Sequence, residues 1–311
     1  MKKVVVHLEW PERCFRAEAP ELAALRRIAG PSWRIVRTRT ENAFLRALRD
    51  AECAIVWSFR KEWFAKAPRL RTLATPGAGR ELVAWRDAPP GVHVHFGGFH
   101  GAIMAESVAA YVLASARGFF RPELASRRPF GKTWPRTALS DKCFTVAGTN
   151  AVVVGYGRVG RAIGAKLEAL GIAVDGVSRA NAGELPRLAA KADWLVLALP
   201  SDTGTDRLLD ARLISRLPRR ARVVNVGRGN AIDEEALLAA LASGRIAGAY
   251  LDVFRGEPGP LADAGGGTLG AVLSVPRRSL PPNLVVMPHS SAFASQYLEL
   301  CFKELKNDGC L

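Results

Sequence analysis

The chain has 311 residues, 49% hydrophobic residues and a formal net charge of +15 at pH 7, which fits a globular protein of two ordinary domains and excludes a disordered or fibrous chain. The positive charge lies in short, scattered clusters that are not interleaved with aromatic residues, which argues against a nucleic-acid groove and favours a basic surface that attracts small anions. The cysteines form no Cys-x-x-Cys pair and no apolar stretch reaches about eighteen residues, so we expect no disulfide framework, no zinc site, no membrane span and a cytoplasmic location.

Strands and helices alternate in the N-terminal part of the chain. Apolar runs predict strands at residues 3–8, 33–36 and 54–57, and amphipathic spacing predicts helices at 21–28 and 41–48. Such alternation is typical of a small parallel α/β domain. The loop Thr75-Pro-Gly-Ala-Gly79 follows a further apolar segment, where it either binds a ligand through its backbone N–H groups or forms a plain turn.

A glycine-rich segment, Gly97 to Gly101, precedes a long helix predicted over residues 102–119. We expect this helix to connect two domains, with the glycines as a hinge. Residues 121–141 are polar and contain prolines and aromatics, which predicts a linker that runs over the surface.

The stretch Ala151-Val-Val-Val-Gly155-Tyr-Gly157-Arg-Val-Gly160 predicts a buried strand, a glycine turn and the start of a helix, with a second strand at 172–177. Gly155 permits the turn, Gly157 lets the backbone approach a pyrophosphate, and Gly160 lets the helix pack on the strand. No Gly-Lys-Ser or Gly-Lys-Thr follows, which excludes a Walker loop. The unit therefore predicts a dinucleotide site, with the phosphates at the helix N-terminus.

The residues after the second strand indicate which dinucleotide binds. A free ribose 2′-hydroxyl is usually held there by an acidic residue, whereas a 2′-phosphate needs positive charge. This chain has Ser178-Arg179 at that point, and a hydroxyl with a guanidinium can bind the phosphate. We therefore expect NADP to be preferred, with NAD possible. Asp175, inside the strand, is the competing candidate, and Arg179 can also be one surface arginine among many.

Further apolar runs predict strands at 195–199, 222–226, 246–251 and 285–286, and a closing helix at 297–305 that crosses back to the first domain. The ends of these strands are expected to converge on the cofactor edge of one sheet. Residues 259–280 are rich in glycine and proline, which predicts an irregular insertion.

Three residues at or just after predicted strand ends have the chemistry to reduce a 2-keto acid: Arg228, Glu257 and His289. The guanidinium of Arg228 can bind the carboxylate and polarise the carbonyl, and the imidazole of His289 can donate the proton. Glu257 would orient the imidazole and favour its protonated form. Taken singly, His289 can be a structural histidine and Glu257 a turn residue, but the cofactor unit favours the catalytic interpretation.

The segments 225–233, 248–258 and Met287-Pro-His289, with the glycine motif, Ala105-Glu106 and the loop at 76–79, resemble the D-isomer-specific 2-hydroxyacid dehydrogenase family in order and spacing. The pair Ser178-Arg179 resembles the pattern found at this position in the NADP-using glyoxylate and hydroxypyruvate reductases of the family. The resemblance implies two doubly wound parallel-sheet α/β domains: a flavodoxin-like substrate domain of residues 1–101 and 290–311, and a Rossmann dinucleotide-binding domain of residues 102–289. It also implies a homodimer that reduces a small 2-keto acid to the D-2-hydroxy acid in a cleft.

By the same resemblance, Arg228, Glu257 and His289 match the catalytic residues of the family, and Ala78 and Gly79 match the backbone N–H pair that receives the substrate carboxylate. A further set matches positions around the cofactor: Gly155, Gly157, Arg158, Val159, Gly160, Ser178, Arg179, Pro200, Thr205 and Asp252. The pattern departs from the family at Ser290-Ser291, where apolar or small residues are more usual, and in the long segment after Pro258.

Other functions share these motifs. Phosphite oxidation in related enzymes uses a similar arginine, glutamate and histidine set, whereas the formate dehydrogenase branch lacks the glutamate. A dinucleotide-sensing corepressor of the family can also keep all three residues. The chain shows no added interaction tail of the kind that such corepressors usually gain.

Overall fold

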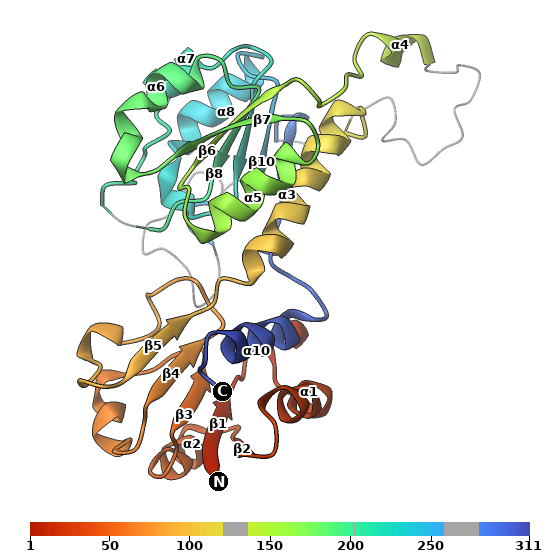
Figure 1. The fold of residues 1–311 in the computed structure, drawn as a ribbon. Coiled ribbons are helices and arrows are strands. Elements are labelled where there is room, and N and C mark those ends of the chain that lie inside the picture. Colours follow the sequence, from red (N-terminus) through yellow and green to blue (C-terminus); the bar gives the residue numbers. More distant parts are fainter. Residues whose placement is uncertain (121–135, 202, 258–279) are drawn as a thin grey trace. The chain divides into compact units, whose positions relative to one another are not determined.

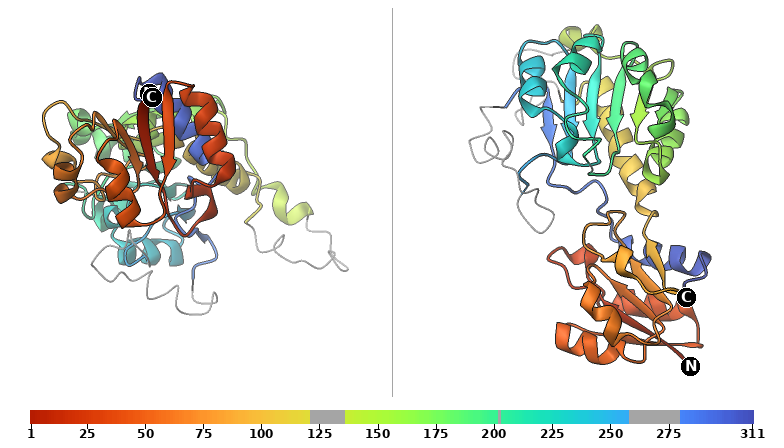
Figure 2. Two further views of the ribbon diagram at one scale, coloured as in Figure 1. Left: turned by 90° about the horizontal axis from the view of Figure 1, so that it is seen from below. Right: turned by 90° about the vertical axis from the view of Figure 1, so that its left-hand side faces the viewer.

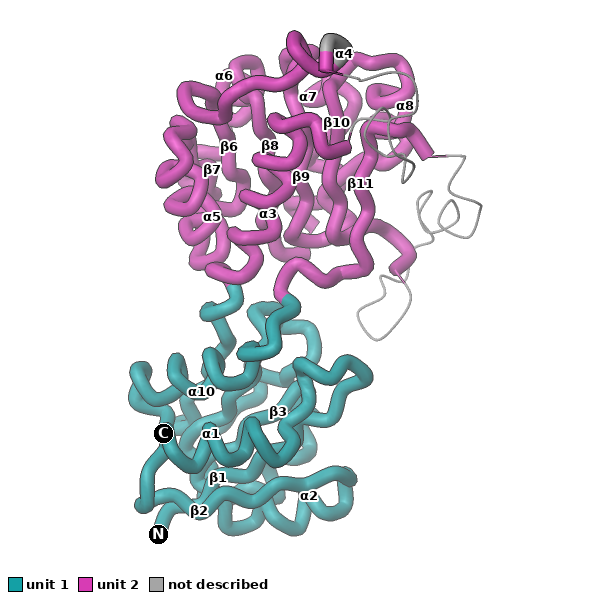
Figure 3. The backbone as a smooth tube through the Cα atoms, turned by 90° about the vertical axis from the view of Figure 1, so that its right-hand side faces the viewer, with its two compact units in different colours: residues 1–100, 293–311 teal, residues 101–292 magenta. Residues whose placement is uncertain are grey.

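The computed structural model describes residues 1–120, 136–201, 203–257 and 280–311. The chain divides into two compact units, residues 1–100 with 293–311, and residues 101–292 (Figure 3). Each unit is built on one sheet, and all the strand pairs of both sheets are parallel. The expected fold of two parallel-sheet α/β domains is confirmed.

The sheet of the first unit has five strands in the order β2-β1-β3-β4-β5 (Figure 1). This is the flavodoxin-like order, in which the winding reverses beside the first strand. The strand β5 was not predicted, because its sequence His-Val-His-Phe offers only one aliphatic side chain. The elements of the unit are β1 (Lys2–His7), η1 (Arg13–Phe15), α1 (Ala19–Ala29), β2 (Trp33–Arg37), α2 (Glu41–Leu48), β3 (Cys53–Val56), η2 (Lys61–Lys66), β4 (Thr72–Thr75), η3 (Trp85–Asp87), β5 (His93–Phe96) and α10 (Tyr297–Asn307).

Helices cover both faces of this first sheet. The helix α2 lies on one face, where Phe44 and Leu48 are buried against Val5 of β1, and α1 and α10 lie side by side on the other (Figure 2). The Oγ1 atom of Thr40 accepts a hydrogen bond from the backbone N–H of Ala43 (3.3 Å), which caps α2. The closing helix of the chain therefore completes the core of the first unit.

The sheet of the second unit has six strands in the order β11-β10-β9-β8-β6-β7. Alternate residues of β6 enter different cores: Ala151 and Val153 pack with α3 and α5, and Val152 and Val154 pack on the opposite face. The strands are apolar on both faces because helices cover both. The elements are α3 (His100–Ala116), α4 (Arg136–Ser140), β6 (Asn150–Val154), α5 (Arg158–Glu168), β7 (Ala173–Val177), η4 (Arg179–Glu184), α6 (Leu185–Ala189), β8 (Trp194–Leu197), α7 (Ala211–Arg216), β9 (Arg222–Asn225), η5 (Gly229–Ala231), α8 (Glu234–Ala242), β10 (Gly248–Leu251) and β11 (Leu284–Val286).

The strand order of the second unit positions its ligand site. The neighbours of β6 are β7 on one side and β8 on the other, so the chain reverses its winding direction at β6. Open parallel sheets bind ligands in the crevice beyond the carboxyl ends of the strands at such a reversal. The glycine turn that starts at Gly155 follows β6 directly, at that point of the sheet.

Two predicted segments differ from the structure. The long helix α3 ends at Ala116 and not near residue 119, because Gly118 adopts a φ of +77° and the N–H of Phe119 turns back to the carbonyl of Ala114 (2.9 Å). The expected linker contains the short helix α4, which was not predicted. Residues 121–135 and most of the expected insertion, residues 258–279, lie outside the described residues. In the part of the chain that the structure describes, no helix is long and apolar enough to cross a membrane.

Candidate functional site

Contacts between backbones hold the turn after β6. Gly155 has a φ of +92°, and its N–H donates a hydrogen bond to the carbonyl of Val177 (2.9 Å). A Cβ atom on Gly155 would lie 2.5 Å from the carbonyl oxygen of Ala198, and one on Gly160 would lie 2.2 Å from the carbonyl oxygen of Gly155. Neither position accepts a side chain. The helix α5 and the loop after β8 therefore lie directly against the turn.

The position of Gly157 is different, because it faces open space. This residue is the N-cap of the 11-residue helix α5, and a Cβ atom placed there would have no neighbour within 4 Å. The free N–H groups and the dipole at a helix N-terminus favour a phosphate. The first turn of the helix begins with Arg158 and Val159. These residues fit the pyrophosphate of a dinucleotide.

The side chain of Tyr156 supports this turn and was not singled out from the sequence. A Cβ atom on Gly176 of β7 would lie 2.4 Å from Cγ of Tyr156, and one on Gly164 of α5 would lie 2.7 Å from its hydroxyl. The ring therefore rests on two places where the backbone has no side chain. Glycine in the middle of a strand often marks such a close approach, so Gly176 was the available signal.

The tip of β7 carries the residues expected to select the cofactor. Ser178 and Arg179 are both exposed, and the backbone N–H of Ser178 donates to Oδ1 of Asn181 (2.7 Å). The competing Asp175 forms an ion pair with Lys191 (3.0 Å). The carboxylate of the strand is thus paired, and a hydroxyl and a guanidinium are presented at its end.

The loop after β8 contains the other two predicted cofactor positions, Pro200 and Thr205. The hydroxyl of Thr205 donates to the carbonyl of Pro200 (2.9 Å), which closes the loop on itself. Asp202 between them lies outside the described residues.

The structure brings Glu257 and His289 together. Nδ1 of His289 lies 2.8 Å from Oε2 of Glu257, and Oε1 of the same carboxylate accepts a hydrogen bond from the backbone N–H of Phe254 (2.8 Å). The histidine side chain is 33% exposed and the glutamate side chain 13%. The carboxylate therefore holds the ring from its buried side and leaves Nε2 as the nitrogen that can exchange a proton with a bound molecule.

A second carboxylate, that of Asp252, holds the backbone around the histidine. Asp252 is 1% exposed and accepts hydrogen bonds from the backbone N–H groups of Ser290 (2.8 Å) and Ser291 (3.1 Å), and from the hydroxyl of Ser291. His289 has a φ of +53°, and its N–H donates to the carbonyl of Asp252 (2.9 Å). The serine that departs from the family pattern thus supplies a donor to a buried carboxylate.

The loop of Arg228 depends on Asn225, which is completely buried. Oδ1 of Asn225 accepts from the N–H of Gly227 (3.1 Å), and its Nδ2 donates to the carbonyl of Arg228 (3.0 Å). Nη1 of Arg228 donates to the carbonyl of Gly227 (2.9 Å). We did not select Asn225 from the sequence as a site residue, although an asparagine at a strand end, two residues before Gly227, can accept a hydrogen bond from the backbone N–H two residues on and so form a turn.

The loops of Arg228 and Glu257 are in contact. A Cβ atom on Gly229 would lie 2.2 Å from the carbonyl carbon of Phe254, the residue whose N–H holds Glu257. The close approach of these backbones fixes the loop of the arginine against the loop of the glutamate.

Ala78 and Gly79 belong to the first unit, in the loop after β4. The N–H of Gly97 donates to the carbonyls of Thr75 (3.0 Å) and Gly77 (3.1 Å), and a Cβ atom on Gly97 would lie 2.1 Å from the carbonyl oxygen of Pro76. The base of the loop is therefore fixed, and Ala78 at its tip is exposed.

Comparisons with known proteins show which proteins this chain is similar to. Residues 109–291 match the family model described as D-isomer specific 2-hydroxyacid dehydrogenase, NAD binding domain. The chain is 26% identical to a glycerate dehydrogenase of Methylorubrum extorquens over 86% of this chain and 84% of that protein. It is 31% identical to glyoxylate/hydroxypyruvate reductase B of Pectobacterium carotovorum over 74% of this chain and 71% of that protein.

A solved structure is also similar over most of the length. It is a D-isomer specific 2-hydroxyacid dehydrogenase from Xanthobacter autotrophicus Py2 in complex with NADPH and MES, with a TM-score of 0.70 and 25% identity, over 99% of this chain and 95% of that one.

Gly157, which faces open space, and Gly160, which lies against backbone, should respond differently to substitution by alanine. Gly157→Ala should leave the free energy of unfolding nearly unchanged and weaken dinucleotide binding about tenfold or more, because the methyl group enters the space for the phosphates. Gly160→Ala should lower the free energy of unfolding by about 1–3 kcal/mol, because its methyl group meets backbone. Urea unfolding and fluorescence titration with NADPH would measure both. Unchanged cofactor affinity in Gly157→Ala would contradict the phosphate assignment.

The two serines after the histidine also form a matched pair. Ser291→Ala removes a buried hydroxyl that donates to a carboxylate and should lower the free energy of unfolding by about 1–3 kcal/mol. Ser290→Ala should stay within about 0.5 kcal/mol, because Ser290 bonds Asp252 through its backbone. If the two substitutions changed the free energy of unfolding equally, the hydrogen bond from the Ser291 hydroxyl to Asp252 would not contribute to stability.

Proposed function

Because the chain belongs to the D-isomer specific 2-hydroxyacid dehydrogenase family, we propose that it reduces a small 2-keto acid to the D-2-hydroxy acid, with NADPH as the preferred cofactor. The observation that carries this proposal is the 2.8 Å contact between Nδ1 of His289 and the carboxylate of Glu257. A histidine held on one nitrogen by a partly buried carboxylate is suited to give a proton from the other.

Each of three side chains has a distinct part in the proposed reaction. The guanidinium of Arg228 binds the substrate carboxylate and polarises the carbonyl through its planar fork. His289 donates a proton from Nε2 to the carbonyl oxygen, and Glu257 keeps the ring oriented and balances its charge. We also propose that the backbone amides of Ala78 and Gly79 bind a substrate carboxylate. The bound nicotinamide supplies the hydride.

The preference for NADPH rests on the tip of β7. Arg179 and Ser178 are exposed at the position where a 2′-phosphate would lie, and Asp175 is already paired with Lys191. A substrate with a short side chain is supported by the similarity to a glycerate dehydrogenase and to a glyoxylate/hydroxypyruvate reductase.

The first test is an absorbance assay at the nicotinamide band with glyoxylate, hydroxypyruvate, pyruvate and bulkier 2-keto acids. We expect NADPH to be oxidised faster than NADH with one of the short acids. Arg179→Ala should lower kcat/KM for NADPH about tenfold and leave that for NADH unchanged. Arg187→Ala removes an exposed arginine that pairs with Glu184 and serves as the control. Equal or better turnover with NADH in the wild-type chain would refute the preference.

The proton donor and the substrate cation can be tested in the same assay. His289→Ala should lower kcat by about two to four orders of magnitude and leave cofactor affinity nearly unchanged. Arg228→Lys should also be severe, because a point charge cannot replace a planar fork. Turnover that survives His289→Ala would remove His289 from the mechanism.

A further inference from the structure

Three loops of the second unit meet at one backbone oxygen, the carbonyl oxygen of Asn230. It accepts a hydrogen bond from the backbone N–H of Arg207 (2.8 Å), in the loop after β8, and a second from Nη2 of Arg255 (3.1 Å), in the loop after β10. Asn230 itself belongs to η5, which follows Arg228 directly. One oxygen therefore joins the loop proposed to line the cofactor to the two loops that carry the proposed catalytic arginine and glutamate.

The side chain and the backbone of Arg255 both hold this junction. Nη2 of Arg255 also donates a hydrogen bond to Oδ1 of Asp206, in the loop after β8, and the arginine side chain is 24% exposed. Its backbone N–H donates to Oε1 of Glu234 at the start of α8 (2.6 Å), and Glu234 is buried. An ion pair that solvent reaches contributes little alone, but this arginine is also fixed through a backbone carbonyl and a buried carboxylate.

Arg255 is next in sequence to the residue that fixes Glu257. That residue, Phe254, donates its backbone N–H to the Glu257 carboxylate (2.8 Å), and the other oxygen of the carboxylate lies 2.8 Å from Nδ1 of His289. A shift of Arg255 would therefore move the N–H that fixes the glutamate, and the glutamate orients the imidazole. A continuous series of contacts thus runs from the loop after β8, through Arg255, to the ring of His289.

The backbone at Arg207 has an unusual conformation. Among the described residues, two that are not glycine have a positive φ, Arg207 (+47°) and His289 (+53°). Residues with a Cβ atom rarely adopt this region, and they persist there where the surrounding contacts hold them, often at functional sites. In this conformation the N–H of Arg207 reaches the carbonyl of Asn230. The strained turn and the bonds of Arg255 therefore depend on the same oxygen.

We propose that Arg255 is a positioning residue, whose guanidinium couples the loop after β8, where we propose that the dinucleotide binds, to the loop that carries Glu257. A dinucleotide bound at the loop after β8 then steadies the loop of Glu257 and keeps the proton donor aligned with the nicotinamide. Misplacement of reacting groups by about 1 Å can cost about a hundredfold in rate. The effect on turnover rests on the proposed reductase function, whereas the coupling of the loops requires only that a dinucleotide binds.

The first test is hydrogen–deuterium exchange of the full chain with and without NADPH, or NADH if NADH binds more tightly. Fluorescence titration would first establish that each protein is saturated. In the wild-type chain we expect the dinucleotide to protect the backbone amides of residues 203–209 and of residues 251–257. In Arg255→Ala the protection of 203–209 should remain, and that of 251–257 should fall to about half or less. This test needs no substrate.

The second test is turnover with a short 2-keto acid. Arg255→Ala should lower kcat about tenfold and change KM for the keto acid less than about twofold, because Arg228 still binds the substrate. Asp206→Arg should also lower kcat, because it places two guanidinium groups together. The double variant with Asp206→Arg and Arg255→Glu restores an ion pair in the opposite direction and should have a kcat about threefold higher than Asp206→Arg alone. A purely structural role would lower Tm without this rescue of kcat.

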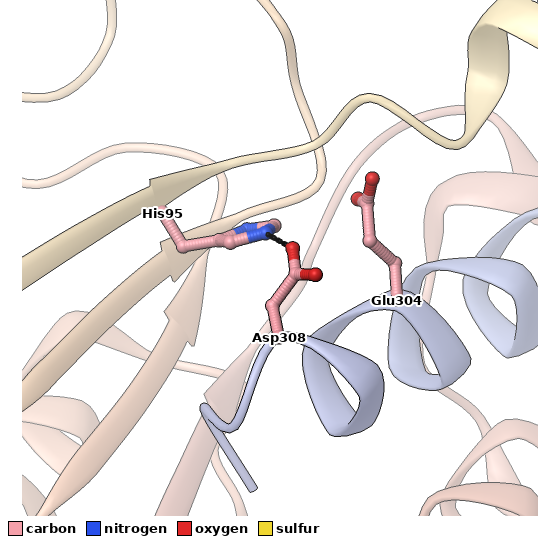
Figure 4. Close-up of side chains that lie close together, drawn as sticks. All are labelled: His95, Glu304 and Asp308. Atoms are coloured by element: carbon pink, nitrogen blue, oxygen red, sulfur yellow. Dashed lines mark hydrogen bonds and ion pairs between the residues drawn. The ribbon is translucent and has the colours of Figure 1, made fainter.

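The control is Asp308→Asn in the first unit, to which none of the three loops belongs. Figure 4 shows the Asp308 carboxylate beside the ring of His95, and Oδ2 lies 2.9 Å from Nε2. The substitution therefore removes the charge from another ion pair between distant segments. It should leave kcat and the protection of residues 251–257 unchanged, and circular dichroism would check the fold of each variant.

Three results would overturn the inference: no protection of residues 251–257 by the dinucleotide in the wild-type chain, full protection of them in Arg255→Ala, or no rescue of kcat in the double variant. If the exchange results are as expected but the wild-type chain turns over none of the keto acids, the coupling is supported and the proposed reductase function is contradicted.

Discussion

Close contact between backbones at the carboxyl ends of the strands of the second unit is the constraint on which its site depends. Gly155 lies against Ala198, Gly227 against Leu199 and Gly229 against Phe254, each at a distance that leaves no room for a Cβ atom. Loops that pack on one another in this way cannot move separately. The site is built from loops, but these contacts make it as rigid as the sheet beneath it. Proton and hydride transfer require such rigidity, because they tolerate little misplacement of the reacting groups.

Two carboxylates near His289 have different surroundings and therefore different roles. Asp252 is buried and receives its hydrogen bonds from the two residues that follow the histidine, so it fixes the path of the backbone. Glu257 is bonded to the ring itself and to one backbone N–H, so it fixes the direction of the imidazole. Asp252 therefore sets the position of the histidine backbone, and Glu257 sets the orientation of its side chain. Orientation of a functional side chain by such outer contacts is common in enzyme sites.

The parts of the molecule that could be predicted from sequence are those with a strong local signal. The apolar run at 151–154 and its glycines specify the dinucleotide unit, and Arg228, Glu257 and His289 follow predicted strands or their loops. What could not be predicted depends on contacts between distant segments. The ring of Tyr156 on Gly176, the double hydrogen bond of Asn225 and the bond from Ser291 to Asp252 all require knowledge of which loops meet. The strand β5 was missed because its two histidines hide the apolar alternation.

At His289 the backbone conformation favours glycine, whereas the proposed chemistry needs an imidazole. A residue with a Cβ atom at a φ of +53° costs about 1–2 kcal/mol relative to its relaxed conformation, and glycine would escape that cost but would bring no imidazole. With the proton-donor role proposed for His289, selection for heat resistance and selection for turnover act on this residue in opposite directions. The hydrogen bonds from Ser290 and Ser291 to Asp252 offset part of this cost. A lineage that no longer needed the imidazole could therefore lose both the left-handed histidine and these hydrogen bonds.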